Sequence, residues 1–288
     1  MTHNTQQICS FNNSGELKQV HAVLDESDSG SSHAKRICWS PTERTRFAVV
    51  GDSKFVEFWD VRSSQATSRI LTTGSNINAS WSPDGRFLSV SNYYDKIMIL
   101  DPKNGAGQDF LGVMNMTSEV NAFSWSKNSD YMLVSGSNKE KGSVELLNFH
   151  DGKFHKVDSL PLAVSTCQLL IVDPTYKRMV VTSSDQILSF WNLNDLTCDK
   201  IYRNGFAIKC CSFSGDGKFC ATASDEYIRI FDSTTAEMKT EVHAKCKVSQ
   251  VAWNPREGSI LALDTDPLYF KESSRNQRGL SAIRLLRL

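Results

Sequence analysis

The sequence lacks any long apolar run. No stretch of about 18 consecutive apolar residues occurs in it, so we expect no membrane-spanning helix. Its first residues, M-T-H-N-T-Q-Q, lack the charged and apolar regions of a secretory signal peptide, so we expect the chain to stay in a reducing compartment. The eight cysteines are then expected to be thiols rather than disulfides.

The sequence also lacks net charge, because its 32 basic residues balance its 32 acidic residues. This balance argues against a strong attraction of the whole surface to nucleic acid or to an anionic membrane. A local basic patch that contacts RNA remains open.

Motifs of catalysis and of cofactor binding are missing as well. The sequence contains no glycine-rich phosphate loop, no His-Glu-x-x-His and no Gly-x-Ser-x-Gly. The cysteines that lie closest to one another include no Cys-x-x-Cys pair; they are Cys198, Cys210, Cys211 and Cys220, with His243 and Cys246 beyond them. Consecutive residues of a strand point to opposite faces, so Cys210 and Cys211 are not expected to bind one ion together. We therefore expect no enzyme, no metal, no cofactor and no small-molecule substrate, and we expect the cysteines to be small buried side chains.

What the sequence does contain is a recurring hairpin. Trp81 ends one apolar segment, and Ser82-Pro83-Asp84-Gly85 follows with the residues typical of a type I turn. A second apolar segment begins at Phe87, so the pattern predicts a β-hairpin. One hairpin buries too little apolar surface to be stable in water, so Trp81 is expected to pack against another part of the chain.

The hairpin recurs every 40 to 47 residues, with strand-end anchors at Trp39, Trp81, Trp125, Val172, Phe213 and Trp253. This period, together with the aromatic anchors, predicts the four-stranded blades of a propeller. In the unit 208–247, we expect strands at 208–213, 219–223, 227–231 and 238–242. Twisted sheets that are apolar on both faces must stack between neighbours, so Trp81 is predicted to fill the seam between its own blade and the next.

These repeats resemble WD40 repeats, most clearly at 58–60 and 81–85. The resemblance covers six units: 33–75, 76–119, 120–163, 164–207, 208–247 and 248–288. It implies an all-β propeller of the seven-bladed type with an incomplete first blade, folded as one domain over residues 1–288. The residues expected to hold the repeats together are Trp39, Trp59, Trp81, Trp125, Asp185, Trp191, Asp225, Phe231 and Trp253.

The repeats depart from the WD40 pattern at two positions. The Gly-His dipeptide that usually opens a unit is missing. The turn aspartate six residues before the aromatic is present only as Asp185, before Trp191, and as Asp225, before Phe231. We therefore expect the buried His–Ser–Asp–Trp network of the family to be absent and apolar packing to carry more of the stability.

The two ends of the chain leave the closure of the propeller open. Residues 8–12 resemble a third strand and 17–23 a fourth, whereas 281–288 resembles a third strand with no fourth. Residues 17–23 could complete the last blade and give a six-bladed ring. Alternatively, the ring keeps seven-fold curvature, with residues 1–32 as a partial first blade and an acidic, serine-rich linker. We favour the second closure, because the missing part resembles a truncation of a seven-unit protein.

Longer segments resemble the WD40 proteins that form one subunit of the THO complex, the core of the transcription–export (TREX) assembly. They are 58–64, 74–85, 182–196 and 213–226, together with a long insertion at 269–279. The resemblance implies a nuclear, non-enzymatic scaffold that binds the other THO/TREX subunits and helps package messenger RNA for export. The alternative is another WD40 adaptor, such as a substrate receptor of a ubiquitin ligase.

Candidate contact residues lie in the predicted loops. Tyr93 and Tyr94 fall in a turn between a second and a third strand, and exposed aromatic side chains near basic groups can stack on bases. The small basic clusters are Arg44 and Arg46, Lys139 and Lys141, Lys177 and Arg178, and Arg275 and Arg278. From these we select Tyr93, Tyr94, Lys139, Lys141 and Arg275 as binding residues, with any RNA contact expected to be weak and salt-sensitive. The simpler interpretation, which the sequence favours, is that these loops are solvated and that the two tyrosines cap a blade.

Overall fold

In the computed structural model, every regular element among the described residues is a β-strand, as the repeat pattern predicts. The described residues are 7–11, 17–22, 34–63, 65–103, 110–138, 141–162, 165–244, 247–255, 260–265 and 282–287. Across these residues the structure holds no helix long and apolar enough to span a membrane. Contacts divide the chain into two compact units. The first comprises Met1–Val120, Trp125–Leu133 and Leu146–Asp158, and the second comprises Asn121–Ser124, Val134–Glu145 and Ser159–Leu288.

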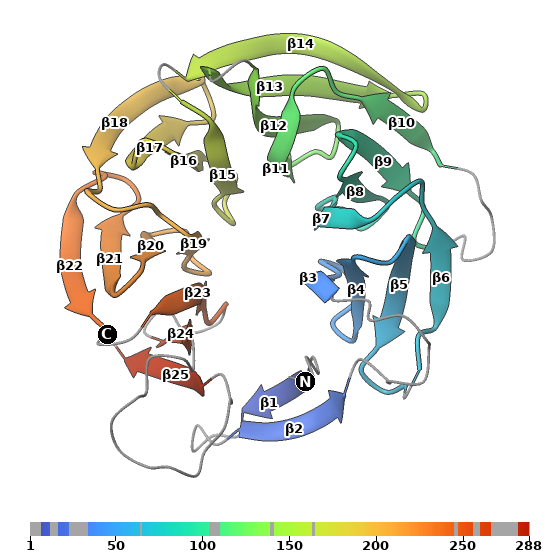
Figure 1. The fold of residues 1–288 in the computed structure, drawn as a ribbon, viewed down its shortest axis with the longest axis horizontal. Coiled ribbons are helices and arrows are strands. Elements are labelled where there is room, and N and C mark those ends of the chain that lie inside the picture. The colour runs from blue at the N-terminus through green and yellow to red at the C-terminus, as the bar shows by residue number, and fades with distance from the viewer. Residues whose placement is uncertain are drawn as a thin grey trace. The chain divides into compact units, whose positions relative to one another are not determined.

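The first unit contains three antiparallel sheets in which strands that are consecutive in sequence pair with one another (Figure 1). One has two strands, β1 (Gln7–Phe11) and β2 (Leu17–Ala22). The second has four: β3 (Ala34–Trp39), β4 (Arg46–Gly51), β5 (Phe55–Asp60) and β6 (Ser68–Leu71). The third also has four: β7 (Asn76–Trp81), β8 (Leu88–Asn92), β9 (Lys96–Leu100) and β10 (Gly112–Asn115).

The next four-stranded sheet has residues in both units. Its strands are β11 (Glu119–Trp125), β12 (Tyr131–Asn138), β13 (Lys141–His150) and β14 (Lys153–Leu162). β13 and β14 have 10 residues each, whereas the outer strand of the sheet before has 4.

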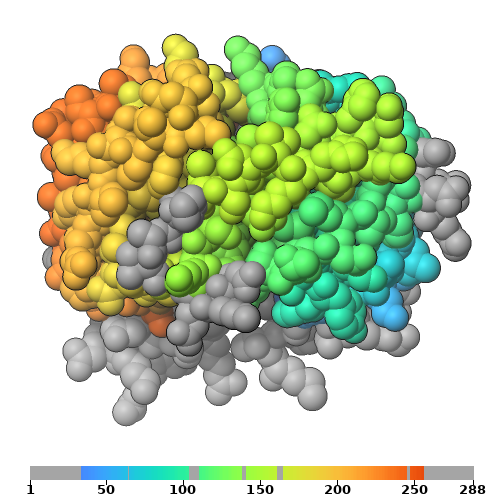
Figure 2. Space-filling view, turned by 90° about the horizontal axis from the view of Figure 1, so that it is seen from above, coloured from blue at the N-terminus to red at the C-terminus, as the bar shows by residue number. Residues whose placement is uncertain are grey.

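The second unit contains the remaining three sheets. The first has β15 (Cys167–Val172), β16 (Arg178–Ser183), β17 (Ile187–Asn192) and β18 (Thr197–Arg203). The second has β19 (Cys210–Phe213), β20 (Phe219–Ser224), β21 (Tyr227–Asp232) and β22 (Met238–His243). The last has three strands, β23 (Val248–Trp253), β24 (Ile260–Thr265) and β25 (Ala282–Arg287). The outer strands β18 and β22 are exposed along most of their length and lie on the surface, gold and orange in Figure 2.

The hairpin turn predicted at Ser82–Gly85 is present. The backbone N–H of Gly85 donates to the carbonyl of Ser82 at 2.9 Å. Gly85 adopts a φ of 72°, in the left-handed region that glycine reaches without strain. The Ser82 hydroxyl oxygen accepts the N–H of Phe87 at 2.9 Å and so ties the turn to the next strand. Ser214 and Gly217 repeat the 2.9 Å turn bond, which shows why the Ser-x-Asp-Gly pattern recurs.

Trp81 fills a seam between two sheets, but with the sheet before it rather than the next. Its indole N–H donates to the carbonyl of Cys38 at 3.1 Å, and its ring meets Phe58 edge to face at 6.0 Å. Alternate residues of a strand share a face, and Ala79 lies in the same core as Trp81, with Val50 of β4. The expected direction of packing was therefore wrong.

The other strand-end aromatics show the same relationship. Trp125 stacks on Phe87 of the preceding sheet at 5.9 Å, and Trp253 stacks on Phe219 at 6.2 Å. Phe213 lies in a core with Phe190. Trp39 differs, because it packs on Phe47 of its own sheet and keeps 49% of its surface exposed.

The strands at the two ends bear on the closure of the propeller. β2 pairs with β1 in a sheet of its own, and the last sheet has three strands, as expected. Among the described strands, β2 therefore does not complete the last sheet. The number of blades stays a prediction.

Candidate binding surfaces

Two lysine–aspartate ion pairs tie a first strand to the turn between the second and third strands of the same sheet. Lys209 Nζ lies 2.6 Å from a carboxylate oxygen of Asp225, and Lys35 Nζ lies 2.7 Å from Asp52. Each lysine stands four residues before the strand-end anchor of its sheet, Phe213 or Trp39. The two ion pairs therefore lie at equivalent positions of two different sheets.

The ion pairs shift the pKa values of their members. The hydrogen bond from Lys209 holds the pKa of the Asp225 carboxyl below its usual value, and the positive charge of Lys247 adds to this effect. Hydrogen bonds to Asp52 and then to the Tyr93 hydroxyl raise the pKa of Lys35. Because both pairs are partly exposed to water, each contributes less than about 1 kcal/mol to stability.

Asp185, the other turn aspartate, holds its turn through serines. The hydroxyl of Ser183 donates to its carboxylate, and its own backbone N–H donates to Ser165 Oγ at 3.1 Å. The indole N–H of Trp191 donates to Ser189 Oγ at 2.8 Å, within the same strand. Phe231 is fully buried, and Trp59 donates from its indole to Glu57 at 3.1 Å.

Tyr93 and Tyr94 lie in the turn between β8 and β9, as predicted, with 60% and 69% of their surfaces exposed. Both are nevertheless held in place. The Lys35 ammonium lies 4.2 Å from the centre of the Tyr93 ring and donates to its hydroxyl. The Tyr94 ring covers Gly74 so closely that a Cβ there would come within 2.8 Å of it. The turn thus presents two fixed aromatic side chains to solvent.

Of the other three predicted binding residues, the structure describes only Lys141. Lys141 begins β13 and is exposed. Lys139 and Arg275 lie outside the described residues.

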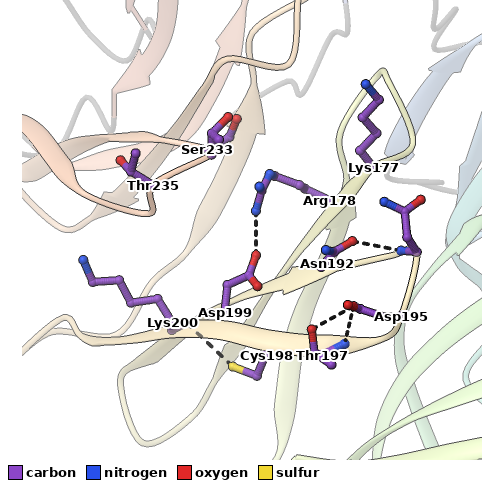
Figure 3. Close-up of polar contacts among 12 residues, drawn as sticks. Lys177, Arg178, Asn192, Asp195, Thr197, Cys198, Asp199, Lys200, Ser233 and Thr235 are labelled. Atoms are coloured by element: carbon purple, nitrogen blue, oxygen red, sulfur yellow. Dashed lines mark hydrogen bonds and ion pairs between the residues drawn. The ribbon is translucent and has the colours of Figure 1, made fainter.

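One of the two residues of the basic cluster at 177–178 forms an ion pair within the fold. Arg178 pairs with Asp199 of β18 at 2.7 Å, while Lys177 points away from that pair (Figure 3). In the first unit, Arg46 similarly donates to the carbonyl of Pro102 at 2.6 Å. Arg46 and Arg178 therefore connect neighbouring parts of the fold, which reduces the case for a nucleic-acid surface at these clusters.

A pocket that the sequence did not single out opens in the second unit. It has a volume of about 340 Å³ and is lined by Phe206, Asp225, Glu226, Tyr227 and Lys247. The rings of Phe206 and Tyr227 stack with 5.4 Å between their centres and 14° between their planes. Phe206 keeps 44% of its surface exposed, so part of this side chain is accessible to a ligand.

A buried arginine lies close to Tyr227 of this aromatic pair. Arg229 is only 8% exposed, and its guanidinium carbon lies 5.8 Å from the Tyr227 ring centre. Its Nε donates to Glu241 and one terminal nitrogen donates to the Asn204 carbonyl, both at 2.6 Å. Since a buried guanidinium is tolerated only with such partners, its position is fixed. Arg229, Tyr227 and Phe206 are thus linked by successive contacts, and we call them the aromatic platform.

The signal that could have found this pocket was positional. Asp225, Glu226 and Tyr227 stand at the same turn of their sheet as Tyr93 and Tyr94 do in theirs. Phe206 comes from the loop between β18 and β19, and its approach to Tyr227 depends on tertiary structure.

Of the six cysteines whose burial the structure describes, Cys167, Cys211 and Cys220 are buried as predicted. Cys210 and Cys211 contribute to two different cores, on opposite faces of β19. Burial raises the pKa of Cys167 and of Cys220 to about 12, so both stay protonated thiols at neutral pH. Cys198 differs, because it is exposed. Within the described part of the chain, no three His, Cys, Asp or Glu side chains are grouped to hold a metal ion.

Comparison with known proteins agrees with this architecture. The family model of the WD domain, G-beta repeat, matches residues 197–232, which run from β18 to β21. The β-propeller domain of Cps50 (Swd1) from Myceliophteria thermophila superimposes with a TM-score of 0.72 at 13% sequence identity, covering 91% of this chain and 96% of that one. The chain therefore belongs to the class of proteins with a β-propeller fold, and its segment 197–232 matches the WD repeat.

Within this class, the chain is similar to THO complex subunit 3 of Arabidopsis thaliana. The two are 26% identical over 273 residues, which cover 89% of this chain and 84% of the plant protein. It is also 29% identical over 189 residues to WD repeat-containing protein AAC3 of Dictyostelium discoideum, a match that covers 63% of this chain and 38% of that protein.

Proposed function

We propose that the chain is a non-catalytic scaffold subunit of a THO complex, which it joins in the nucleus by binding other subunits. The observation that carries the proposal is the similarity to THO complex subunit 3, which extends over 89% of the chain. A similarity of that extent covers sheets from both compact units rather than a single repeat.

The structure supports a binding role in physical terms. Its sheets hold turns and loops whose side chains can vary without disturbing the core. The exposed pair Tyr93–Tyr94 and the pocket at Phe206 are two such places, and aromatic side chains with fixed positions are favoured at protein interfaces. We infer that partner contacts use these turns and that the scaffold supports messenger RNA packaging and export.

The experiment is to recover the tagged full chain from nuclear extract, with and without ribonuclease, and to identify the proteins that co-purify. We expect the other THO subunits in both samples, because the contacts are between proteins. Recovery of a ubiquitin-ligase core in their place would support the alternative adaptor. Loss of every partner on ribonuclease treatment would mean that RNA bridges the chain to the complex.

A further inference from the structure

The pocket at Phe206 has the chemistry of a site for one arginine side chain. We propose that it binds an arginine presented by an extended segment of a partner protein, with the guanidinium stacked on the open face of Phe206 and paired to Glu226. This goes beyond the proposed function, because it does not depend on which complex the chain joins.

The aromatic platform accounts for the stacking half of the recognition. Phe206 is stacked on Tyr227, and the Arg229 guanidinium lies near the Tyr227 ring, so both rings have partners in the fold. A planar guanidinium over such a ring gains a cation–π contact, which is stronger where the surrounding residues exclude water.

The charges in the pocket leave Glu226 as the acceptor for a cation. Two carboxylates line it, but Asp225 is already neutralised by Lys209 at 2.6 Å and lies in the field of Lys247. Glu226 Oε2 makes a 2.9 Å hydrogen bond with His243, and no described residue supplies a partner for Oε1. That oxygen can accept from an incoming guanidinium, and a charge-assisted bond of this kind is among the stronger ones in proteins.

The size and charge of the pocket argue against other ligands. A volume of about 340 Å³ is at the small end for ligand sites, large enough for one long side chain. A nucleic-acid strand would bring phosphates towards Glu226, whose negative charge repels them. An arginine is attracted by Glu226 and repelled by Lys247, so the pairing with Glu226 is what favours its binding.

The test uses the full chain and two blocked pentapeptides, acetyl-Gly-Gly-Arg-Gly-Gly-amide and its citrulline counterpart, which has the same shape without the charge. Binding is followed by NMR chemical shift changes. We expect the arginine peptide to shift signals of Phe206 and Tyr227 and to bind at least about tenfold more tightly than the citrulline peptide, the ratio that 1.4 kcal/mol produces.

Two variants locate the site. Phe206→Ala and Glu226→Gln should each weaken the arginine peptide by about tenfold, a factor that corresponds to 1.4 kcal/mol. Glu226→Gln keeps the shape of the side chain, so it stays informative if the loss of the Phe206 ring disturbs the loop. Glu237→Gln, at an exposed carboxylate of the same sheet, is the matched control and should bind as the parent does.

Three results would overturn the proposal. They are equal binding of the arginine and citrulline peptides, shifts that map away from Phe206, and an oligouridine that displaces the arginine peptide and takes the platform itself. If the peptide binds as expected but no THO subunit co-purifies, the pocket stands and the proposed function falls.

Discussion

The indole N–H of Trp81 donates to the backbone carbonyl of Cys38, 43 positions earlier in the chain. The bond joins the end of β7 to the end of β3, across the seam between two sheets. Because a carbonyl is the acceptor, it depends on the backbone and not on the identity of the side chain at 38. Packing of the Trp81 ring against Phe58 adds to it.

Replacing Trp81 by Phe should lower the free energy of unfolding by about 1–3 kcal/mol, because an inter-sheet hydrogen bond and part of the ring contact are lost. Chemical denaturation measures the change. Trp191→Phe is the matched control, since that indole bonds only to Ser189 of its own strand. A larger loss for Trp191→Phe than for Trp81→Phe would contradict the assignment of Trp81 to the seam.

Gly142→Ala should destabilise the second unit through crowding. A Cβ at this position would lie 2.1 Å from the carbonyl oxygen of Ser165 and 2.6 Å from Cys167 Sγ, so the backbone has to move. Such overpacking costs about 1–3 kcal/mol. Gly205→Ala is the contrast, because its φ is 79° with nothing within 4 Å, and it should cost about 1 kcal/mol from backbone strain alone. In thermal denaturation, Gly142→Ala should have a lower melting temperature than Gly205→Ala. The reverse order would show that crowding at Gly142 is not costly.

The Lys209–Asp225 pair should make stability depend on pH in the acid range. The folded-state pKa of Asp225 lies below its value in the unfolded chain, about 3.9, so the contribution is present above that pH and is lost as the pH falls through the folded pKa. Asp225→Asn should therefore lower the melting temperature slightly at neutral pH and match the parent in strong acid. An Asp225→Asn deficit that persists unchanged in acid would show that the ion pair is not its source. A Lys209→Met and Asp225→Asn double-mutant cycle should give a coupling below about 1 kcal/mol.

Cys198 should react with iodoacetamide before Cys167 and Cys220. It is exposed, although partial burial raises its pKa somewhat. Cys167 and Cys220 combine burial with a pKa of about 12, and the reactive thiolate is therefore scarce and hidden. Mass spectrometry of the native chain after brief labelling identifies the modified positions. Labelling of Cys220 before Cys198 would contradict the packing of β20.

Replacing Tyr93 and Tyr94 together by Ala should leave folding intact and reduce the recovery of protein partners. The two rings are mostly exposed, so little core packing is lost. Co-purification from nuclear extract, with circular dichroism as the folding control, measures both effects. The exposed pair Glu237 and Lys239, replaced by Ala, serves as a surface control on another sheet. Unchanged recovery would remove the tyrosines from the interface.

Local sequence patterns predicted the strands well, but they did not predict which side chains from different elements contact one another. The strands of the unit from β19 to β22 fall within two residues of their expected bounds, because alternating apolar residues and Ser-Gly-Asp-Gly specify a hairpin locally. The pairing of Arg178 with Asp199 was not foreseen, since exposure alone does not say which charges meet. The same is true of Phe206, whose partner Tyr227 lies on another element.

The seam at Trp81 also shows how a correct pattern can leave a direction undetermined. The sequence indicated that Trp81 needs a neighbouring sheet, but a strand has two faces and the period of two does not say which face meets which neighbour. The hydrogen bond to Cys38 and the shared core with Ala79 and Val50 resolve it.

This direction of packing has a consequence for how the chain is made. Trp81, Trp125, Phe213 and Trp253 each rest on a sheet that precedes them in the sequence. Segments emerge from the ribosome in that same order, and N-terminal parts fold first. Each aromatic anchor thus finds its docking surface already synthesised when its own strand appears, so assembly can advance one sheet at a time without waiting for the end of the message.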